Sequence, residues 1–199
     1  MTRDSDIPPE VQKDIMNATF RAITRYGYAD LTMEKIAEES NKCKSTIHYH
    51  YGTKENLMVD FIKYLQKGFK RNIVPDTGDP LERLNGVIDR MLFGTKNGKI
   101  PERFHTALLE LRSQAPYNER YRRQITENDE LIHGKVKGII EDGIEKGVFE
   151  KEDPGTIATI ILSAVDGARA RQISTERKAV EKARNSLDDI IDEILLKGR

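Results

Sequence analysis

The sequence predicts an all-α protein, and three observations support this fold class. Apolar residues recur at spacings of three and four along nearly the whole chain, as they do on the buried face of an amphipathic helix. Alternation of apolar and polar residues, which is typical of a half-buried strand, is essentially absent. Glycine and proline fall between the periodic segments. We therefore expect about nine helices joined by turns.

The first predicted helix covers residues 10–26 and follows Pro8 and Pro9. Gly27 comes directly after it, where glycine readily adopts the left-handed conformation that ends a helix. The apolar stripe of this helix consists of Val11, Ile15, Ala18, Ala22 and Tyr26. This spacing predicts one buried face.

A second and a third helix follow, joined by a tight turn. Thr32 is a good N-cap for the second helix, because its hydroxyl can accept a hydrogen bond from a free backbone N–H. Asn41 occupies the turn, where we expect it because asparagine tolerates positive φ. The third helix is predicted over 44–51, and Gly52 ends it.

The rest of the chain predicts six longer helices. Thr53 can cap a fourth helix that runs to about residue 72, and a turn-rich hinge follows at 76–80. Asp79-Pro80 and Asp153-Pro154 are signals of a cap followed by a first helical residue. The further helices are predicted over 80–96, 101–114, 118–146, 154–173 and 176–197. We predict a small three-helix domain, 1–53, joined through the fourth helix to a larger helical domain, 54–199.

The composition indicates a soluble cytoplasmic protein. Hydrophobic residues make up 37% of the chain and charged residues 33%, with equal numbers of basic and acidic side chains. Cys43 is the one cysteine, so no disulfide can form within the chain, which suits a reducing compartment. No apolar run approaches the roughly 18 residues of a membrane span. The N-terminus lacks the apolar stretch of a signal peptide.

The segment from Ser40 to Lys54 has the chemistry of a DNA-reading helix. It contains three lysines, two histidines and two tyrosines, and it contains no acid. A projection at about 100° per residue makes Ile47 the apolar anchor and puts Ser45 and Tyr49 on the opposite side. A helix with one buried side and a polar, cationic and aromatic opposite side fits the DNA major groove.

Individual side chains of this helix suit particular DNA atoms. Lys44 can donate to guanine O6 or N7. His48 and His50 can donate to phosphate oxygens. Lys54, in the first turn of the fourth helix, can bind the same phosphate as that helix's free N–H groups. The N–H groups of the second helix, with Thr32, can do likewise.

The stretch YGYADLTMEKIAEESNKCKSTIHYHYGTKENL also resembles the N-terminal helix-turn-helix of TetR/AcrR-type transcriptional repressors. The resemblance covers about residues 10–60 and rests on Gly27, Thr32-Met33, Ile36-Ala37, Thr46-Ile47, the run His48 to Tyr51, and Lys54 to Leu57. The chain departs from the family pattern in the turn and the third helix, at Asn41, Lys42, Cys43, Ser45 and His48.

The resemblance implies a homodimeric repressor that binds a pseudo-palindromic double-stranded DNA operator. The family's roles in DNA contact fall on Thr32, Met33, Lys44, Ser45, Thr46, His48, Tyr49, His50 and Lys54. The larger domain is then expected to bind a small effector and to form the dimer. A mostly apolar pocket with a few Arg and His groups would suit a hydrophobic or anionic effector.

The larger domain contains candidates for both of these roles. Residues that can line a pocket are Phe93, Phe104, His105, Leu108, Leu111, Arg112, Tyr121, Ile125, Asp166 and Arg169. For the apolar members the alternative is packing in the core, and for the polar members it is a core or surface position with its hydrogen bonds satisfied. Residues that can form a four-helix dimer interface are Ile157, Ile160, Ile161, Ala164, Val165, Ala168, Leu187, Ile190, Ile191, Ile194 and Leu195.

Two other classes of function remain as alternatives, a helical enzyme and an interaction or ligand-binding module without a DNA role. The sequence lacks a nucleophile–base set and a phosphate-binding loop, so we predict no enzymatic activity and no cofactor. Cys43, His48 and His50 do not have the spacing of a zinc site, so we predict no metal. A stable monomer would favour the interaction module, because a monomer cannot bind two half-sites.

Overall fold

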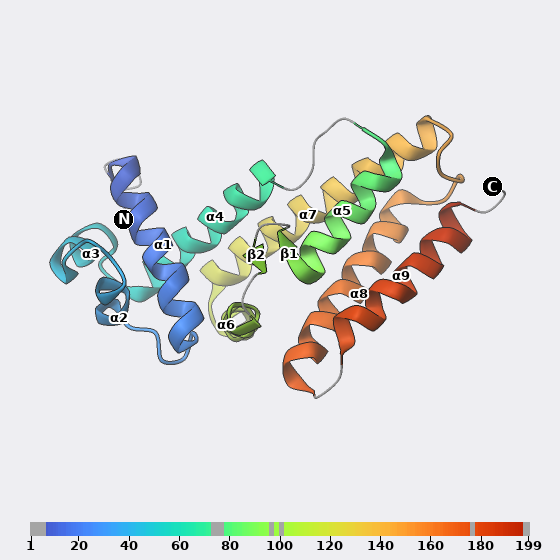
Figure 1. Ribbon diagram of the computed structural model, residues 1–199. Helices are drawn as coiled ribbons and strands as arrows, with labels where there is room; N and C mark the ends of the chain where they lie inside the picture. The colour runs from blue at the N-terminus through green and yellow to red at the C-terminus, as the bar shows by residue number, and fades with distance from the viewer. Residues whose placement is uncertain (1–6, 73–77, 96–97, 100–101, 176–177, 197–199) are drawn as a thin grey trace. The chain divides into compact units, whose positions relative to one another are not determined.

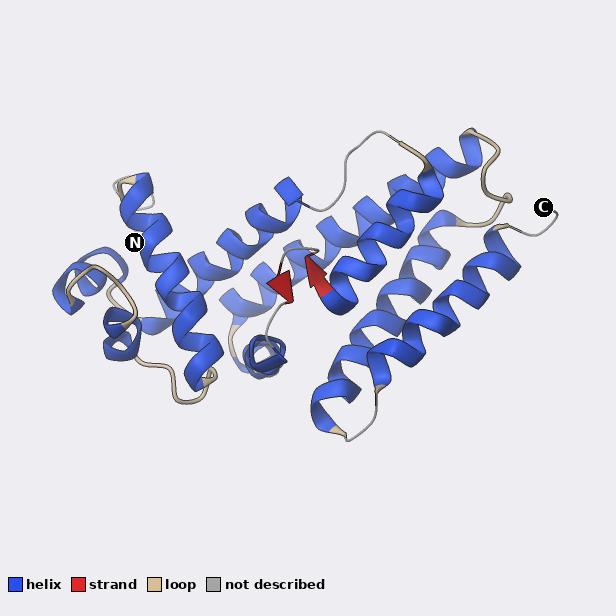
Figure 2. Ribbon diagram, viewed as in Figure 1, coloured by secondary structure: helices blue, strands red, loops and turns tan. Residues whose placement is uncertain are grey.

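The computed structural model describes residues 7–72, 78–95, 98–99, 102–175 and 178–196, and these are almost entirely helical (Figures 1 and 2). The all-α prediction is confirmed. The helices are α1 Pro9–Tyr26, α2 Met33–Glu38, α3 Lys44–Tyr51, α4 Lys54–Asn72, α5 Pro80–Phe93, α6 Glu102–Ser113, α7 Glu119–Glu145, α8 Pro154–Ser174 and α9 Ala179–Leu195. A short 3-10 helix, η1, spans Ala115–Tyr117.

Side-chain caps begin several of these helices where the sequence predicts them. The hydroxyl of Thr32 accepts a hydrogen bond of 3.2 Å from the backbone N–H of Lys35. Equivalent caps are formed by Thr53 on the N–H of Asn56, by Asp79 on the N–H groups of Leu81 and Glu82, and by Asp153 on the N–H of Thr156. Each cap satisfies N–H groups that the helix itself leaves free, and so fixes where the helix begins.

The chain forms two compact units. The first contains Met1–Phe69 and Pro101–Glu127, and the second contains Lys70–Ile100 and Asn128–Arg199. In the first unit α1 packs against both α2 and α6, and α2 packs against α3. Its core includes Ile15, Ile23, Ile36, Ile47, Leu57, Phe61 and Leu111. The predicted boundary of an independent domain at residue 53 stays a prediction.

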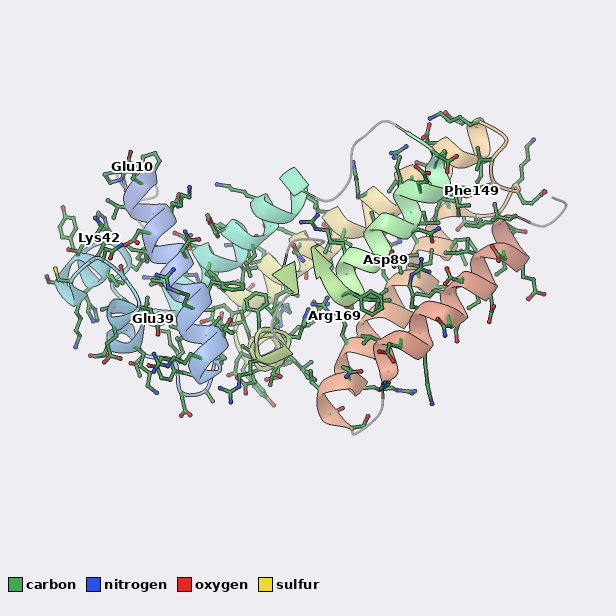
Figure 3. All side chains as sticks on the ribbon, in the orientation of Figure 1. Glu10, Glu39, Lys42, Asp89, Phe149 and Arg169 are labelled. Carbon is green, nitrogen blue, oxygen red and sulfur yellow. The ribbon has the colours of Figure 1, made fainter. Side chains whose placement is uncertain are left out.

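The second unit is built around α8 and α9, which lie side by side, with α5 against both of them (Figure 1). A hydrogen-bonded ion pair of 2.5 Å between Arg83 and Asp142 joins α5 to α7. The ring of Phe149, labelled in Figure 3, packs directly against Gly143 of α7. Because this ring fills the space where a Cβ would lie, the close packing requires glycine at 143.

Three local features differ from the sequence predictions. Helix α5 ends at Phe93, earlier than predicted, because Gly94 takes φ 88°. A two-residue antiparallel pair follows, β1 Gly94–Thr95 with β2 Gly98–Lys99, which the sequence did not predict. Asn41 forms the α2–α3 turn without positive φ, which only glycines adopt among the described residues. Some predicted residues lie outside the described residues: 76 and 77 of the hinge, 96 of the fifth helix, 101 of the sixth helix, and 176, 177 and 197 of the ninth helix.

Candidate DNA-binding surface

Two buried side chains anchor α3 to the rest of the first unit. Ile47 is fully buried and Tyr51 is 3% exposed, so the same side of α3 faces the core at both positions. Gly52 ends the helix with φ 68°, and its N–H donates to the carbonyl of His48. This anchoring fixes which side of the helix remains available to a partner.

The opposite side of α3 faces solvent. Tyr49 is 77% exposed, and Lys44, Ser45 and His48 are also exposed. Thr46 and His50 are half-buried. The rings of Tyr49 and His50 form a T-shaped pair, with 5.2 Å between the ring centres. The exposed side of α3 therefore combines a cation, hydroxyl groups and aromatic rings, which are the groups suited to a DNA groove.

Cys43 forms a small polar cluster at the start of α3. Its sulfur lies 3.0 Å from the Ser45 hydroxyl and 3.1 Å from the Thr46 hydroxyl. Hydrogen bonds from Ser45 first, and then from Thr46, lower the pKa of Cys43 to about 7. A substantial fraction of this exposed thiol is therefore ionised near neutral pH.

Lys44, the residue predicted to bind guanine, is ion-paired with Glu34 of α2. Both side chains are about half exposed, 51% for Lys44 and 53% for Glu34. The hydrogen bond from Lys44 is the main cause of a lowered pKa at Glu34, so the carboxyl is ionised at neutral pH. The sequence did not predict a role for Glu34. It lies on α2 and Lys44 lies on α3, and helical periodicity does not show which residues of different helices meet.

Lys54, the residue predicted to bind phosphate, is half-buried against Tyr28. Its Nζ lies 4.6 Å from the centre of the Tyr28 ring and donates a hydrogen bond of 3.3 Å to the Tyr28 carbonyl. Burial lowers the pKa of Lys54. The side chain thus supports the α1–α2 loop, and its contact with phosphate stays a prediction.

The two predicted contact residues at the start of α2 have different environments. Thr32 is exposed, and its hydroxyl is already used in capping the helix. The Met33 side chain is only 6% exposed and belongs to the core. A contact with DNA at Met33 is therefore restricted to its backbone.

Tyr28 lies in the α1–α2 loop and is held by residues from three helices of the first unit. Its backbone N–H donates to the carboxylate of Glu110 on α6 at 2.6 Å, and Lys54 of α4 binds its carbonyl. Its hydroxyl lies 3.3 Å from the hydroxyl of Tyr121 on α7. Burial, followed by this hydrogen bond, raises the pKa of Tyr121, so the Tyr121 hydroxyl is neutral at physiological pH. We call these three contacts the Tyr28 clasp.

The start of α7 also contacts the start of α4. The Arg120 guanidinium donates to the Asn56 side chain at 2.6 Å, and the Asn118 amide donates to Glu55 at 3.0 Å. These contacts lie next to the Tyr28 clasp in sequence. Helices α4, α6 and α7 therefore together hold the loop that leads into α2.

The predicted effector-pocket residues divide between the two units. Phe104, Leu111 and Tyr121 are buried in the first unit, with the Phe104 ring centre 4.5 Å from that of Phe20. The other members in the first unit are His105, Leu108, Arg112 and Ile125, which are half-buried or exposed. In the second unit Phe93 and Asp166 are exposed and Arg169 is half-buried. Their role in binding an effector stays a prediction.

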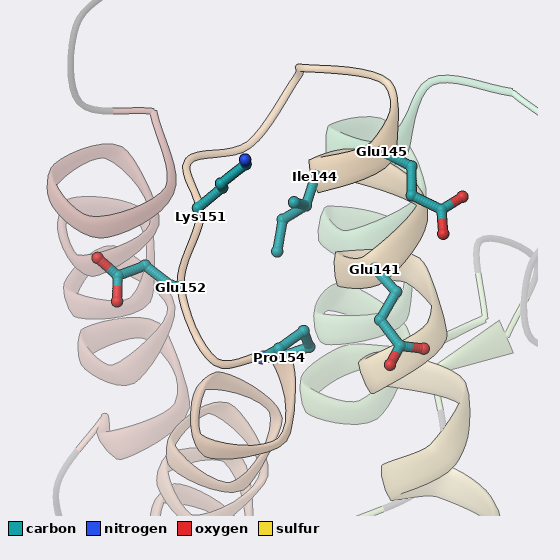
Figure 4. A pocket seen from close by; sticks show the side chains of 6 residues that line it. All are labelled: Glu141, Ile144, Glu145, Lys151, Glu152 and Pro154. Carbon is teal, nitrogen blue, oxygen red and sulfur yellow. The ribbon is translucent and has the colours of Figure 1, made fainter.

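A shallow depression of about 360 Å³ lies in the second unit, between the end of α7 and the start of α8 (Figure 4). It is lined by Glu141, Ile144, Glu145, Lys151, Glu152 and Pro154. These residues differ from those that we predicted for an effector pocket. Four of the six are exposed, three of them glutamates, so the depression is open to solvent.

The predicted dimer-interface residues of α8 and α9 divide into two sets. One set is buried within its own chain and consists of Ile157, Ile161, Val165, Ala168, Leu187, Ile191 and Leu195. The other set remains partly exposed and consists of Ile160, Ala164, Ile190 and Ile194. The wide apolar stripes thus serve mainly the core of one chain, and only the second set is available to a partner.

Over the described residues, no helix is long and apolar enough to span a membrane. The same residues contain no group of three or more His, Cys, Asp or Glu side chains placed to hold a metal ion.

Comparisons with known proteins agree with this architecture. Residues 15–60 match the family described as bacterial regulatory proteins of the tetR family. Residues 80–196, more than half of the chain, match the family described as BetI-type transcriptional repressor, C-terminal.

Individual relatives extend over most of the chain. A TetR transcription regulator from Haloarcula marismortui is 37% identical, with a TM-score of 0.82, over 92% of this chain and 97% of that one. A regulator from Saccharomonospora viridis, solved in complex with choline, is 23% identical, with a TM-score of 0.81, over 94% and 98% of the two chains. The repressor AcnR of Corynebacterium glutamicum is 22% identical over 83% of this chain and 84% of its own. The chain therefore belongs to the TetR family, whose members are transcriptional regulators and not enzymes.

Proposed function

We propose that this regulator is a repressor that binds a pseudo-palindromic DNA operator as a homodimer and is released by a small-molecule effector. The main support is the exposed side of α3, where Tyr49 and Lys44 face solvent while Ile47 and Tyr51 anchor the helix. A short helix held by its apolar side presents its polar side as a rigid reading surface.

The proposed DNA contacts are those of α3 and its neighbours. Lys44 donates to guanine, and Ser45, Thr46 and Tyr49 contact phosphate or thymine methyl groups. His48, His50 and Lys54 bind phosphates, as do Thr32 and the Met33 backbone at the start of α2. Most of these groups sit on α3, which Ile47 and Tyr51 anchor in the core, and this anchoring favours a fixed register on the duplex.

Dimerisation is proposed to use the partly exposed apolar residues of α8 and α9. Ile160 is 41% exposed although it is a large apolar residue on a helix. Together with Ala164, Ile190 and Ile194 it forms an apolar surface that a second copy of the chain would cover in a four-helix arrangement. The dimer would then present two α3 helices about 34 Å apart, one turn of DNA.

The effector is proposed to act by shifting the population between two spacings of the α3 helices. A ligand can weaken operator binding by at most the difference between its binding free energies for the two conformations. Helix α4 is the proposed lever, because its residues belong to both compact units. The sequence favours a hydrophobic or anionic effector, and the relative solved with choline adds a small cation to the set worth testing.

A gel-shift titration tests the DNA-binding part of this proposal. The probe is the DNA upstream of the protein's own gene, and the control is the same sequence shuffled. We expect a shift of the native probe alone, which weakens steeply with added salt as phosphate contacts are lost. Equal binding of both probes would refute operator recognition, and a stable monomer in light scattering would refute the dimer.

A double substitution, Lys44→Ala with Tyr49→Ala, tests the assigned surface. Tyr49 is 77% exposed and Lys44 is about half exposed, so the fold should be unaffected. Loss of two groups that contact bases or phosphates should weaken operator binding by about a hundredfold. Binding as tight as that of the unmodified protein would show that the reading surface lies elsewhere.

A further inference from the structure

The ion pair between Glu34 and Lys44 places a carboxylate on the exposed surface of α2 and α3. Lys44 is the first residue of α3, and the residues at the start of a reading helix lie near base edges in a DNA complex. Glu34 lies in the first turn of the neighbouring α2. Between Ser40 and Lys54 the chain contains no acid. The carboxylate that pairs with Lys44 is that of Glu34, in the preceding helix.

A lysine that is paired with a carboxylate binds phosphates less favourably than base edges. The Lys44 amine has three N–H donors. When one of them is bound to Glu34, the other two remain available to DNA. A phosphate that approaches this amine is repelled by the Glu34 carboxylate, whereas the guanine acceptors O6 and N7 carry no net charge. An unpaired lysine, on its flexible stem, can instead bind any phosphate within reach. The carboxylate therefore makes phosphate contact less favourable for Lys44 than base contact.

We propose that Glu34 is a positioning residue for sequence specificity, which directs the Lys44 amine to base edges and keeps it from binding phosphates. This role rests on the proposed binding of DNA by α3. Non-specific binding depends on phosphate contacts, so Glu34 would lower the affinity for non-specific DNA and preserve the affinity for the operator. The free energy of discrimination between the two kinds of DNA would then depend on an acid that need not touch DNA itself.

The test measures binding of the full chain to two duplexes of about 30 base pairs, long enough for two half-sites. One duplex is enriched from a random library by the unmodified protein, and the other is a shuffled version of it. The variants are Glu34→Gln and, as a control with the same change in charge, Glu130→Gln, an exposed glutamate of α7. Fluorescence anisotropy at several salt concentrations gives both affinities and their salt dependence.

We expect Glu34→Gln to bind the shuffled duplex about threefold to tenfold more tightly, as one added phosphate contact implies. The slope of log affinity against log salt should steepen by about 0.9 for that duplex. Affinity for the enriched duplex should change by less than about twofold, so the specificity ratio falls. Glu130→Gln should leave both affinities and the slope close to those of the unmodified protein.

A second pair of variants tests whether Glu34 acts through Lys44. Glu34→Gln is introduced into a Lys44→Gln background, where it should no longer tighten binding to the shuffled duplex. Tightening that persists in this background would overturn the inference, since the carboxylate would then act as a general negative charge. The inference would also be overturned if Glu34→Gln and Glu130→Gln changed the affinity for the shuffled duplex equally.

The same experiment separates failure of this inference from failure of the proposed function. If the unmodified protein enriches no sequence and binds no duplex, the proposed function fails and the role of Glu34 fails with it. If it discriminates between the duplexes but Glu34→Gln leaves the ratio unchanged, only the role of Glu34 is refuted. Thermal unfolding by circular dichroism should be closely similar for all variants, because the substituted side chains are exposed.

Discussion

The carboxylate of Glu110 accepts a hydrogen bond of 2.6 Å from the backbone N–H of Tyr28, across 82 positions of the sequence. One of its oxygens would also lie 3.2 Å from a Cβ at Gly27, so α6 approaches the α1–α2 loop closely at this point. The loop leads directly into α2 and α3. The orientation of the proposed reading helices within the first unit therefore depends on a side chain of α6.

Replacement of Glu110 by alanine should both destabilise the fold and weaken DNA binding. A hydrogen bond to a charged group is lost and the Tyr28 N–H loses its partner, which should cost about 1–2 kcal/mol in free energy of unfolding. Urea unfolding measures this cost, and the gel shift measures the second effect. Glu130→Ala is the matched control and should change neither. Equal stabilities of the two variants would contradict the importance of the Tyr28 clasp.

Gly143 should tolerate no side chain. A Cβ at this position would lie 2.0 Å from the nearest atom of the Phe149 ring, a distance that requires the ring to move. Gly143→Ala should lower the free energy of unfolding by about 2–3 kcal/mol, as overpacking of a core does.

Gly138, in the same helix, provides the control for this substitution. Nothing lies within 4 Å of a Cβ built there, so Gly138→Ala should stabilise the protein by about 0.5–1 kcal/mol through helix propensity. Adding Phe149→Leu to Gly143→Ala should recover part of the lost stability. Two alanine variants of equal stability, measured by urea unfolding, would refute the close packing of Phe149.

Cys43 should react with iodoacetamide as a thiol of lowered pKa. Only the thiolate is nucleophilic, so the rate should rise with pH through a midpoint of about 7, the pKa of Cys43 in the fold. In urea the hydrogen bonds from Ser45 and Thr46 are lost, and the midpoint should rise to about 8.5. Identical pH profiles for the folded and unfolded protein would contradict the thiol–hydroxyl cluster.

Local sequence signals predicted the reading unit well, because its boundaries depend on neighbouring residues. Thr32 caps α2, Gly52 ends α3, and Ile47 sets the buried side of α3, all within a few positions of the features that they control. The predicted third helix, 44–51, therefore agrees with α3, Lys44–Tyr51. The family resemblance, stated for about residues 10–60, is confirmed by the family model that matches residues 15–60.

The contacts of Glu34 and Glu110 could not be predicted in the same way. Their partners, Lys44 and Tyr28, lie on other elements of the fold, and helical periodicity does not report which elements meet. Prediction from periodicity was limited in the same way for the apolar stripes of α8 and α9. Periodicity identified the apolar faces, but packing of the chain on itself decided that Val165 is buried and Ile160 is exposed.

The most direct test of DNA reading by α3 compares two exposed tyrosines of the first unit. Tyr49 of α3 is 77% exposed and Tyr117 of η1 is 89% exposed, so replacing either with alanine should leave the core intact. Operator affinity is measured by fluorescence anisotropy for Tyr49→Ala, Tyr117→Ala and the unmodified protein. We predict that Tyr49→Ala weakens binding by about tenfold, the value of one good DNA contact, while Tyr117→Ala binds as the unmodified protein does. Equal affinities for Tyr49→Ala and Tyr117→Ala would contradict the claim that the exposed side of α3 reads DNA.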